Sequence, residues 1–273
     1  EHITLTGTAV NATGNAGANT LIGNGSANTL DGGLGADDMS GGDGSDIYVV
    51  DEAGDVVTEA TDEGSDTVQS AITFSIAALA NVEHITLTGT AADATGNDGA
   101  NTLIGNGSAN TLDGGAGADD MSGGDGSDIY VVDEAGDVVT EATDEGSDTV
   151  QSAITFSIAA LANVEHITLT GTAADATGND GANTLIGNGS ANTLDGGLGV
   201  DDLDGGLGDD VLRTDAGLAS GEAFRGGGGT DTLEIMKAGS GADSLVFYSQ
   251  TMTSIEKLIF ASGGTGGSTS LSF

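Results

Sequence analysis

The sequence predicts an all-β fold, a β-solenoid in which short parallel strands stack into coils, and two nested repeats support this prediction. The chain repeats every 82 residues, and residues 1–82 return at 83–164 with four differences: Val10/Ala92, Asn11/Asp93, Ala16/Asp98 and Leu34/Ala116. Within each unit runs a nine-residue period, the nonad, which at 32–40 and 41–49 fits the pattern GGxGxDxUx, where U is a large apolar residue. A repeat of this kind is typical of stacked parallel coils, and the chain has no proline to interrupt a strand.

The nonads predict where turns, strands and core residues lie. Four nonads follow one another at 14–22, 23–31, 32–40 and 41–49, and degenerate copies follow at 50–58 and 61–69. Glycines at positions one, two and four permit backbone angles closed to other residues, so we expect a six-residue turn and then a three-residue strand. The apolar eighth residue should point inward, which predicts a core of Leu21, Leu30, Met39 and Tyr48. Two nonads complete a coil of about 18 residues, and each nonad stacks on the next but one, about 4.8 Å away.

This stacking brings sixth-position side chains together, in the order Asn19, Asp37, Asp55 on one side and Asn28, Asp46, Asp66 on the other. Two stacked carboxylates repel unless a cation lies between them, and a cage of carboxylate and carbonyl oxygens suits Ca²⁺. We therefore predict calcium at the pairs Asp37/Asp55 and Asp46/Asp66, and at their copies Asp119/Asp137 and Asp128/Asp148. Pairs that include Asn19 or Asn28 should be weaker or empty.

The full set of predicted calcium ligands comprises carboxylates and glycine turns of all three units. They are Asp37, Asp46, Asp55, Asp66, Asp119, Asp128, Asp137, Asp148, Asp201, Asp210 and Asp231, with Gly33, Gly35, Gly42, Gly44, Gly115, Gly117, Gly124, Gly126, Gly197, Gly199, Gly206 and Gly208.

Other polar and aromatic residues receive simpler interpretations. Glu59, Asp62 and Glu63 are expected on the solvated surface, and His2, His84 and His166 on a strand face. The aromatic residues Tyr48, Tyr130, Phe74 and Phe156 are expected to fill the core. Without cysteine and with three scattered histidines, the chain is a poor ligand set for Zn²⁺ or Cu²⁺. No hydrolase, zinc-protease or phosphate-loop motif is found, so we predict no catalytic residues and a protein that is not an enzyme.

The charge of the chain limits its partners. There are 43 acidic and 4 basic residues, a net charge of -39, and residues 1–212 contain no Lys or Arg. Nucleic acid and anionic membrane surfaces are therefore very poor partners, and no apolar run approaches the length of a membrane span, so we predict no membrane insertion. The uncompensated charge opposes a compact state until cations bind. We expect the chain to fold when it binds calcium.

The consecutive in-register nonads closely resemble the RTX (repeats-in-toxin) family of calcium-binding proteins. The resemblance implies a right-handed parallel β-roll, aspartate ligands at the sixth position, type I secretion with an uncleaved C-terminal signal, and folding in extracellular calcium. The chain departs from the family pattern where Asn replaces Asp, at Asn19, Asn28 and their copies. It also departs near 70–95, which lacks the glycine turns of the nonad and where β-rich segments at 71–74 and 82–88 predict strands.

We predict four regions: repeat units at 1–82, 83–164 and 165–234, the third with an insert at 214–225, and a C-terminal cap and mobile tail at 235–273. The predicted function is that of a structural or adhesive repeat region of a large secreted bacterial surface protein, such as an adhesin, an S-layer or a matrix protein. Its expected partners are calcium and either further copies of itself, in a filament or layer, or a cell-surface glycan or matrix. The alternative is the C-terminal export-and-folding module of a type I secreted enzyme or toxin.

Overall fold

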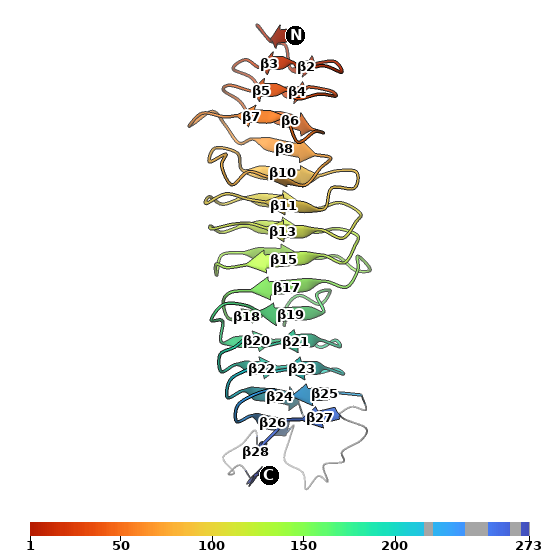
Figure 1. Ribbon diagram of the computed structural model, residues 1–273, viewed down its shortest axis with the longest axis vertical. Helices are drawn as coiled ribbons and strands as arrows, with labels where there is room; N and C mark the ends of the chain where they lie inside the picture. Colours follow the sequence, from red (N-terminus) through yellow and green to blue (C-terminus); the bar gives the residue numbers. More distant parts are fainter. Residues whose placement is uncertain (216–220, 238–250, 263–268, 273) are drawn as a thin grey trace. The chain divides into compact units, whose positions relative to one another are not determined.

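The computed structural model describes residues 1–215, 221–237, 251–262 and 269–272, and the regular elements of these residues are all strands (Figure 1). The predicted all-β solenoid is therefore confirmed. The chain divides into two compact units, Glu1–Gly146 and Ser147–Phe273, which are treated separately below. Within the described residues, no helix has the length and apolar character needed to cross a membrane.

The first unit contains sixteen short strands. They are β1 (His2–Thr4), β2 (Asn11–Thr13), β3 (Thr20–Ile22), β4 (Thr29–Asp31), β5 (Asp38–Ser40), β6 (Ile47–Val50), β7 (Val56–Thr58), β8 (Thr67–Ser70), β9 (Phe74–Ser75), β10 (His84–Leu87), β11 (Asp93–Thr95), β12 (Thr102–Ile104), β13 (Thr111–Asp113), β14 (Asp120–Ser122), β15 (Ile129–Val132) and β16 (Val138–Thr140). Strands β3 to β7 begin at the seventh position of a nonad, as predicted.

Strands of the first unit pair with the next strand but one, so each nonad stacks on the next but one. One ladder runs β1-β3-β5-β7, a second runs from β2 through the even-numbered strands to β16, and a third runs β9-β11-β13-β15. The pairing is parallel, and Leu21 faces Met39 as Leu30 faces Tyr48, an offset of 18 residues. The coil length and the stacking order expected from the nonads are confirmed.

The eighth-position residues form the core, because alternate side chains of each strand point inward. Leu21, Leu30 and Tyr48 are completely buried and Met39 is 1% exposed. The expectation for the other aromatic residues is only partly right. Tyr130 is buried, whereas Phe74 and Phe156 are half-buried, and the aliphatic residues two positions later, Ile76 and Ile158, fill the core instead.

The stretch near 70–95, which lacks the glycine turns, interrupts one ladder of the first unit. The strand expected at 82–88 is observed as β10, but the one expected at 71–74 lies later, at β9. Strand β7 ends its ladder, and β9 pairs with β11 instead of continuing from β7. The long connection from β7 to β8, residues 59–66, follows this interruption directly.

The second unit contains the remaining strands in two ladders, β17-β19-β21-β23-β25-β27 and β18-β20-β22-β24-β26-β28-β29. They are β17 (Thr149–Ser152), β18 (Phe156–Ser157), β19 (His166–Leu169), β20 (Asp175–Thr177), β21 (Thr184–Ile186), β22 (Thr193–Asp195), β23 (Asp202–Asp204), β24 (Val211–Asp215), β25 (Ala223–Arg225), β26 (Thr232–Lys237), β27 (Thr251–Thr253), β28 (Lys257–Ser262) and β29 (Thr269–Ser272).

The predicted insert and tail contribute strands to this second unit. The segment 214–225 carries β25, whose Phe224 is fully buried at the position of an eighth residue, while 216–220 lie outside the described residues. The tail, expected to be mobile, instead forms β29 over Thr269–Ser272, which pairs antiparallel with β28; residues 263–268 and 273 lie outside the described residues. An antiparallel last strand covers the edge that a parallel coil would otherwise extend.

Candidate metal sites

Sixth-position side chains form columns along the stacked coils, because each carboxylate bonds the turn before it. Oδ1 of Asp37 accepts the backbone N–H of Asn19 at 2.7 Å, and Oδ1 of Asp55 accepts that of Asp37 at 3.0 Å. On the other side, Oδ1 of Asp66 accepts the N–H of Asp46 at 2.8 Å. The structure therefore brings together the two pairs that the nonad register predicts in residues 1–82.

The same bonds recur in later repeats. Asp137 accepts the N–H of Asp119 at 3.2 Å, and Asp231 accepts that of Asp210 at 2.8 Å. Three further aspartates accept the N–H of a stacked asparagine: Asp128 from Asn110, Asp201 from Asn183 and Asp210 from Asn192. Asp128 belongs to the first unit and Asp148 to the second.

The second carboxylate oxygen of most column aspartates is buried and accepts no hydrogen bond from the described residues. This holds for Oδ2 of Asp37, Asp46, Asp66, Asp119, Asp201, Asp210 and Asp231. A buried acceptor without a donor costs roughly 1–3 kcal/mol, and more when it is charged. A hard cation would satisfy these oxygens, so the donor set fits calcium.

Burial acts on the protonation of these carboxylates. Loss of hydration raises the pKa of Asp46, Asp119 and Asp210 to about 6 and that of Asp201 to about 7. Neighbouring carboxylates push in the same direction, whereas the bond from the stacked N–H opposes it. Without a cation, these groups therefore favour the protonated form more strongly than a solvated aspartate does.

Asp55 and Asp137 differ from the other column aspartates. Oδ2 of Asp55 accepts the N–H groups of Asp51 and Glu52 at 3.1 and 3.2 Å, and Asp137 receives the same two bonds from its own turn. Both side chains are only half-buried. Their turn lacks the double glycine, and its backbone N–H groups point at the carboxylate instead.

In the asparagine nonads, the sixth-position side chain makes hydrogen bonds that require no cation. Oδ1 of Asn110 accepts the N–H of Asn106 at 2.7 Å, and its Nδ2 donates to the carbonyls of Ala91 and Ala92 at 2.8 and 3.0 Å. Asn28, Asn101, Asn183 and Asn192 make corresponding bonds. In the first coil, Nδ2 of Asn19 has no partner among the described residues.

The twelve glycines predicted as ligands all lie in the turns with positive φ, for example Gly33 at +78° and Gly35 at +116°. Such angles are rare for residues with a β-carbon. Glycine at the first position has a different reason. A β-carbon on Gly32 would collide with Oδ2 of Asp37, and one on Gly41 would collide with Oδ2 of Asp46. The first glycine therefore leaves room for the carboxylate to turn inward.

Glutamates extend the columns where the nonad pattern ends, which the sequence reasoning missed. Oε2 of Glu83 accepts the N–H of Asp66 at 2.9 Å, and Glu165 and Glu256 do the same for Asp148 and Asp231. Each of these acids stands two residues before a buried apolar residue, as Asp66 stands before Val68. That spacing, followed beyond the glycine turns, was the signal that could have found them.

Glu59 is the clearest correction. It was expected on the solvated surface with Asp62 and Glu63, but its side chain is half-buried and both carboxylate oxygens are inaccessible. Burial raises the pKa of Glu59 to about 8, and the carboxylates of Asp66 and Glu63 add to the shift. Asp62 is exposed, as expected, and Glu63 is half-buried.

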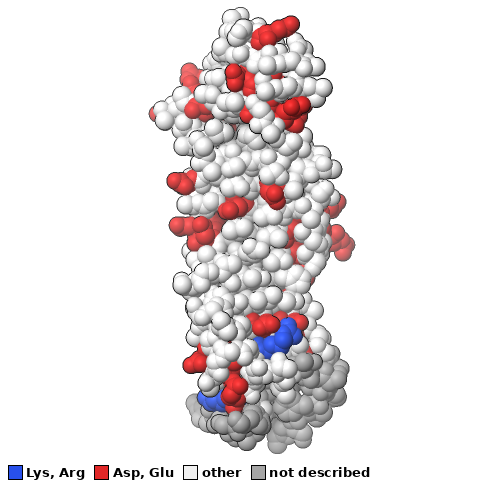
Figure 2. All heavy atoms as spheres, in the orientation of Figure 1, with Lys and Arg blue, Asp and Glu red and all other residues white. Residues whose placement is uncertain are grey.

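Positive charge is confined to the C-terminal third. Figure 2 shows acidic side chains in scattered patches along the visible face and Lys or Arg only near the C-terminal strands. Arg213 pairs with Glu234 at 2.8 Å, and Arg225 pairs with Asp202 and Asp204 on the neighbouring strand. These arginines neutralise acids on the outer strand face and leave the sixth-position columns untouched.

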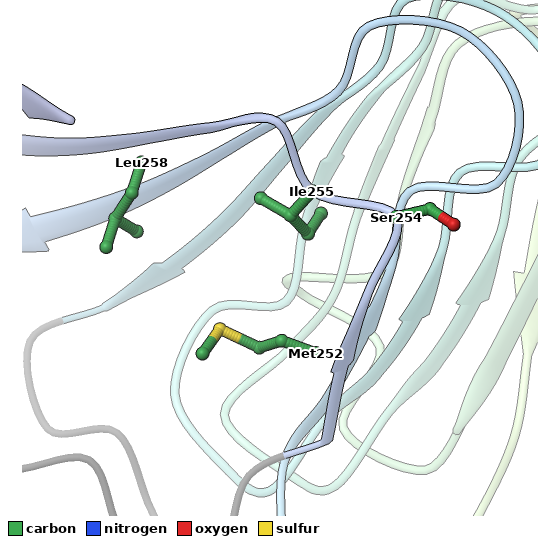
Figure 3. Close-up of a pocket in the computed structure, with 4 residues that line it drawn as sticks. All are labelled: Met252, Ser254, Ile255 and Leu258. Carbon is green, nitrogen blue, oxygen red and sulfur yellow. The ribbon is translucent and has the colours of Figure 1, made fainter. Parts of the chain in front are cut away.

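A pocket in the second unit offers no catalytic group. The cavity, of about 160 Å³, is lined by Met252, Ser254, Ile255 and Leu258, as Figure 3 shows. Three of the four side chains are apolar and none is an acid or a base.

Comparisons with known proteins agree with this geometry. The family model of the RTX calcium-binding nonapeptide repeat matches residues 13–48, 95–130 and 177–212. Each matched segment spans two asparagine nonads and the two aspartate nonads that follow. A comparison with curated proteins finds no match. The calcium-binding repeats, with calcium as their cofactor, and the stacked coils that these repeats build thus identify the chain as one that carries RTX calcium-binding nonapeptide repeats.

Proposed function

We propose that the chain is a non-catalytic, calcium-folded spacer, the structural or adhesive repeat region of a secreted surface protein. The observation that carries the proposal is the recurrence of buried, unpartnered Oδ2 atoms in the sixth-position columns. The ligands are proposed to be the column aspartates together with carbonyls of the glycine turns. Calcium would supply positive charge between stacked carboxylates.

The side chains of the chain itself set the conditions for folding. Residues 1–212 contain no Lys or Arg, so carboxylates such as Asp37 and Asp46 have no side-chain cation within that range to offset their charge. Repulsion between stacked coils opposes their closure, while burial of the eighth-position residues favours it. The balance therefore depends on the concentration of divalent cations, and binding free energy becomes folding free energy.

The proposed location and partners follow from this dependence. Extracellular calcium modules typically bind at about 10⁻⁴–10⁻³ M, which would leave the chain expanded inside a cell and folded outside. Near-identical long repeats suit extension and self-association, with further copies of the chain or a surface glycan as the partner. Because each coil contacts only its neighbours, length can be added without a new core.

The test is a far-UV circular dichroism titration with calcium from a chelator-treated start, with magnesium as the control. We expect a coil-to-β transition near millimolar calcium and none at equal magnesium, because Mg²⁺ requires a tighter octahedral site. A complete β spectrum before calcium is added would contradict coupled folding. So would an equal response to both ions.

A further inference from the structure

The interruption of the ladder in the first unit brings a third acid to the Asp46/Asp66 column. Glu59 directly follows β7, the last strand of its ladder, and its carbonyl accepts a bond from Nδ2 of Asn81 at 3.2 Å. The glutamate thus stands where the ladder has no further strand to pair with β7. Its side chain turns into the coil and not into solvent.

Three carboxylates converge at this point. One carboxylate oxygen each of Asp46, Glu59 and Asp66 lies within 4.8 Å of the other two. Two oxygens on opposite sides of one Ca²⁺ are separated by about 4.6–5.2 Å, so all three can reach the same ion. Asp46 and Asp66 are each 1% exposed, and their Oδ2 atoms have no partner among the described residues.

Residues 1–212 contain no Lys or Arg that could balance this charge. Among the described residues, no basic side chain bonds either oxygen of Glu59, and the side chain that interacts with it is another acid, Glu63. Glu63 and Glu83 lie close enough to raise the pKa of Asp66 further, and His84 opposes them. His84, however, already bonds the hydroxyl of Ser65 at 2.8 Å. Three buried carboxylates at this separation require a cation or protons.

Of the nonads in residues 1–82, only the one that contains Asp46 has a tyrosine. Tyr48 takes the eighth position, and its hydroxyl accepts the N–H of Gly41 at 2.7 Å. The hydroxyl and Oδ2 of Asp46 lie side by side against Gly41, where another residue would carry its β-carbon. In the second repeat, the hydroxyl of Tyr130 donates to Oε1 of Glu141, which holds that glutamate inside the coil.

We propose that Asp46, Glu59 and Asp66 form a three-carboxylate site for a calcium-type cation, with Glu59 as a ligand from outside the nonad. The proposal rests on the calcium-binding function proposed above and adds a stronger class of site to it. In the second repeat of the sequence, Glu141 stands 82 positions after Glu59. With three anionic ligands, this site should bind more tightly than the two-aspartate pairs, because calcium affinity follows ligand charge.

Terbium, a calcium substitute that emits when a nearby tyrosine is excited, reports on this site selectively. The chain has no tryptophan and three tyrosines; Tyr248 lies outside the described residues and is changed to Phe in every variant. E59Q/E141Q should lose most of the tyrosine-sensitised terbium emission. The calcium concentration needed to displace terbium should rise by roughly 10–100-fold, the loss of metal affinity that follows even the removal of a group that only bonds a ligand. The matched control is E52Q/E134Q. It changes two exposed glutamates, each seven residues before Glu59 or Glu141 in the sequence, and it should keep the parental signal.

Each outcome decides the proposal. Parental emission and calcium competition in a folded E59Q/E141Q, or an equal loss in the control, would overturn it. If E59Q/E141Q fails to fold in saturating calcium by circular dichroism, the single change Glu59→Gln is used, and it should remove the part of the emission that Tyr48 sensitises. An unchanged signal there refutes the site. A parent protein that does not fold with calcium would instead refute the proposed function.

Discussion

Asparagine and aspartate nonads build the same coil, but their sixth-position side chains differ in the bonding partners that they have. In both, a three-residue strand buries its eighth side chain, and in both the sixth residue lies in a column. Asn110 fills its place with three hydrogen bonds, one accepted and two donated to carbonyls. Asp119 fills the same place with one bond to Oδ1 and a buried Oδ2 that has no partner among the described residues.

The difference suits two ways of placing positive charge beside the backbone carbonyls: an asparagine amide or a bound cation. The Nδ2 group of the asparagine donates to backbone carbonyls, and in the proposed function an ion held by the aspartate supplies the positive partner instead. The asparagine amide works at any calcium concentration, whereas the bound cation depends on it. In each of the first two repeats, two asparagine nonads are followed by four nonads with aspartate at the sixth position. Under the proposed function, coils that depend on calcium are therefore built against coils that do not.

The largest expected effect comes from removing calcium. Chelation should raise amide hydrogen exchange at 32–49 and 114–131, the aspartate coils, more than at 14–31 and 96–113, the asparagine coils. Hydrogen exchange followed by mass spectrometry, with and without EGTA, measures both sets in one sample. An equal rise in both would show that the coils open as a unit and that the contrast has no energetic meaning.

A change of pH should act on the aspartate coils with a defined sign. Because burial raises the pKa of Asp46, Asp119 and Asp210 to about 6 from 3.8, the folded state binds more protons than the unfolded chain between these values. Stability of the metal-free protein therefore falls as pH rises through this window, by at most about 3 kcal/mol per group. Metal-free samples should show more β structure by circular dichroism at pH 5 than at pH 7.5.

The control for this prediction is the calcium-saturated protein, in which the dependence should reverse. Calcium requires the deprotonated carboxylate, so its apparent affinity rises over the same pH window. A metal-free protein that gains β structure on going from pH 5 to pH 7.5 would contradict the raised pKa values and the unpartnered state of these groups.

The smallest effect should come from replacing a sixth-position asparagine with aspartate. Asn110→Asp places a carboxylate oxygen against the carbonyls of Ala91 and Ala92, which now receive Nδ2 bonds at 2.8 and 3.0 Å. At low fixed calcium, urea unfolding should show a loss of about 1–3 kcal/mol. The loss should shrink at high calcium, where the new carboxylate can act as a ligand.

Asn15→Asp is the matched control, because Asn15 is exposed and its Oδ1 only accepts the N–H of Gly17, at 2.9 Å. A carboxylate can accept that bond equally well, so stability should hardly change. Equal losses for the two variants would mean that added negative charge, and not the buried donor of Asn110, is responsible.

Sequence reasoning predicted those parts of the fold that follow the nine-residue period. Leu21, Met39 and Tyr48 could be placed in the core because period and coil length fix the side to which each points. Glu59 and Glu83 could not be placed, since they fall where the glycine turns stop and the chain path depends on how the ladder resumes. Asp55 kept its predicted place, but its contacts depend on turn N–H directions that the pattern does not specify. The calcium ligands themselves remain predictions.

The number of strands in a repeat has a consequence for how copies are displayed. Residues 1–82 contain nine strands, β1 to β9; β1 to β8 alternate between two ladders, and β9 begins a third. With an odd number, the copy of β1 changes sides: β1 pairs in the ladder of β3, whereas β10 joins the ladder that begins with β2 (Figure 1). Within residues 1–146, the second copy of this strand thus lies in the other ladder, and a molecule that recognises β1 would find β10 on the opposite side of the coil.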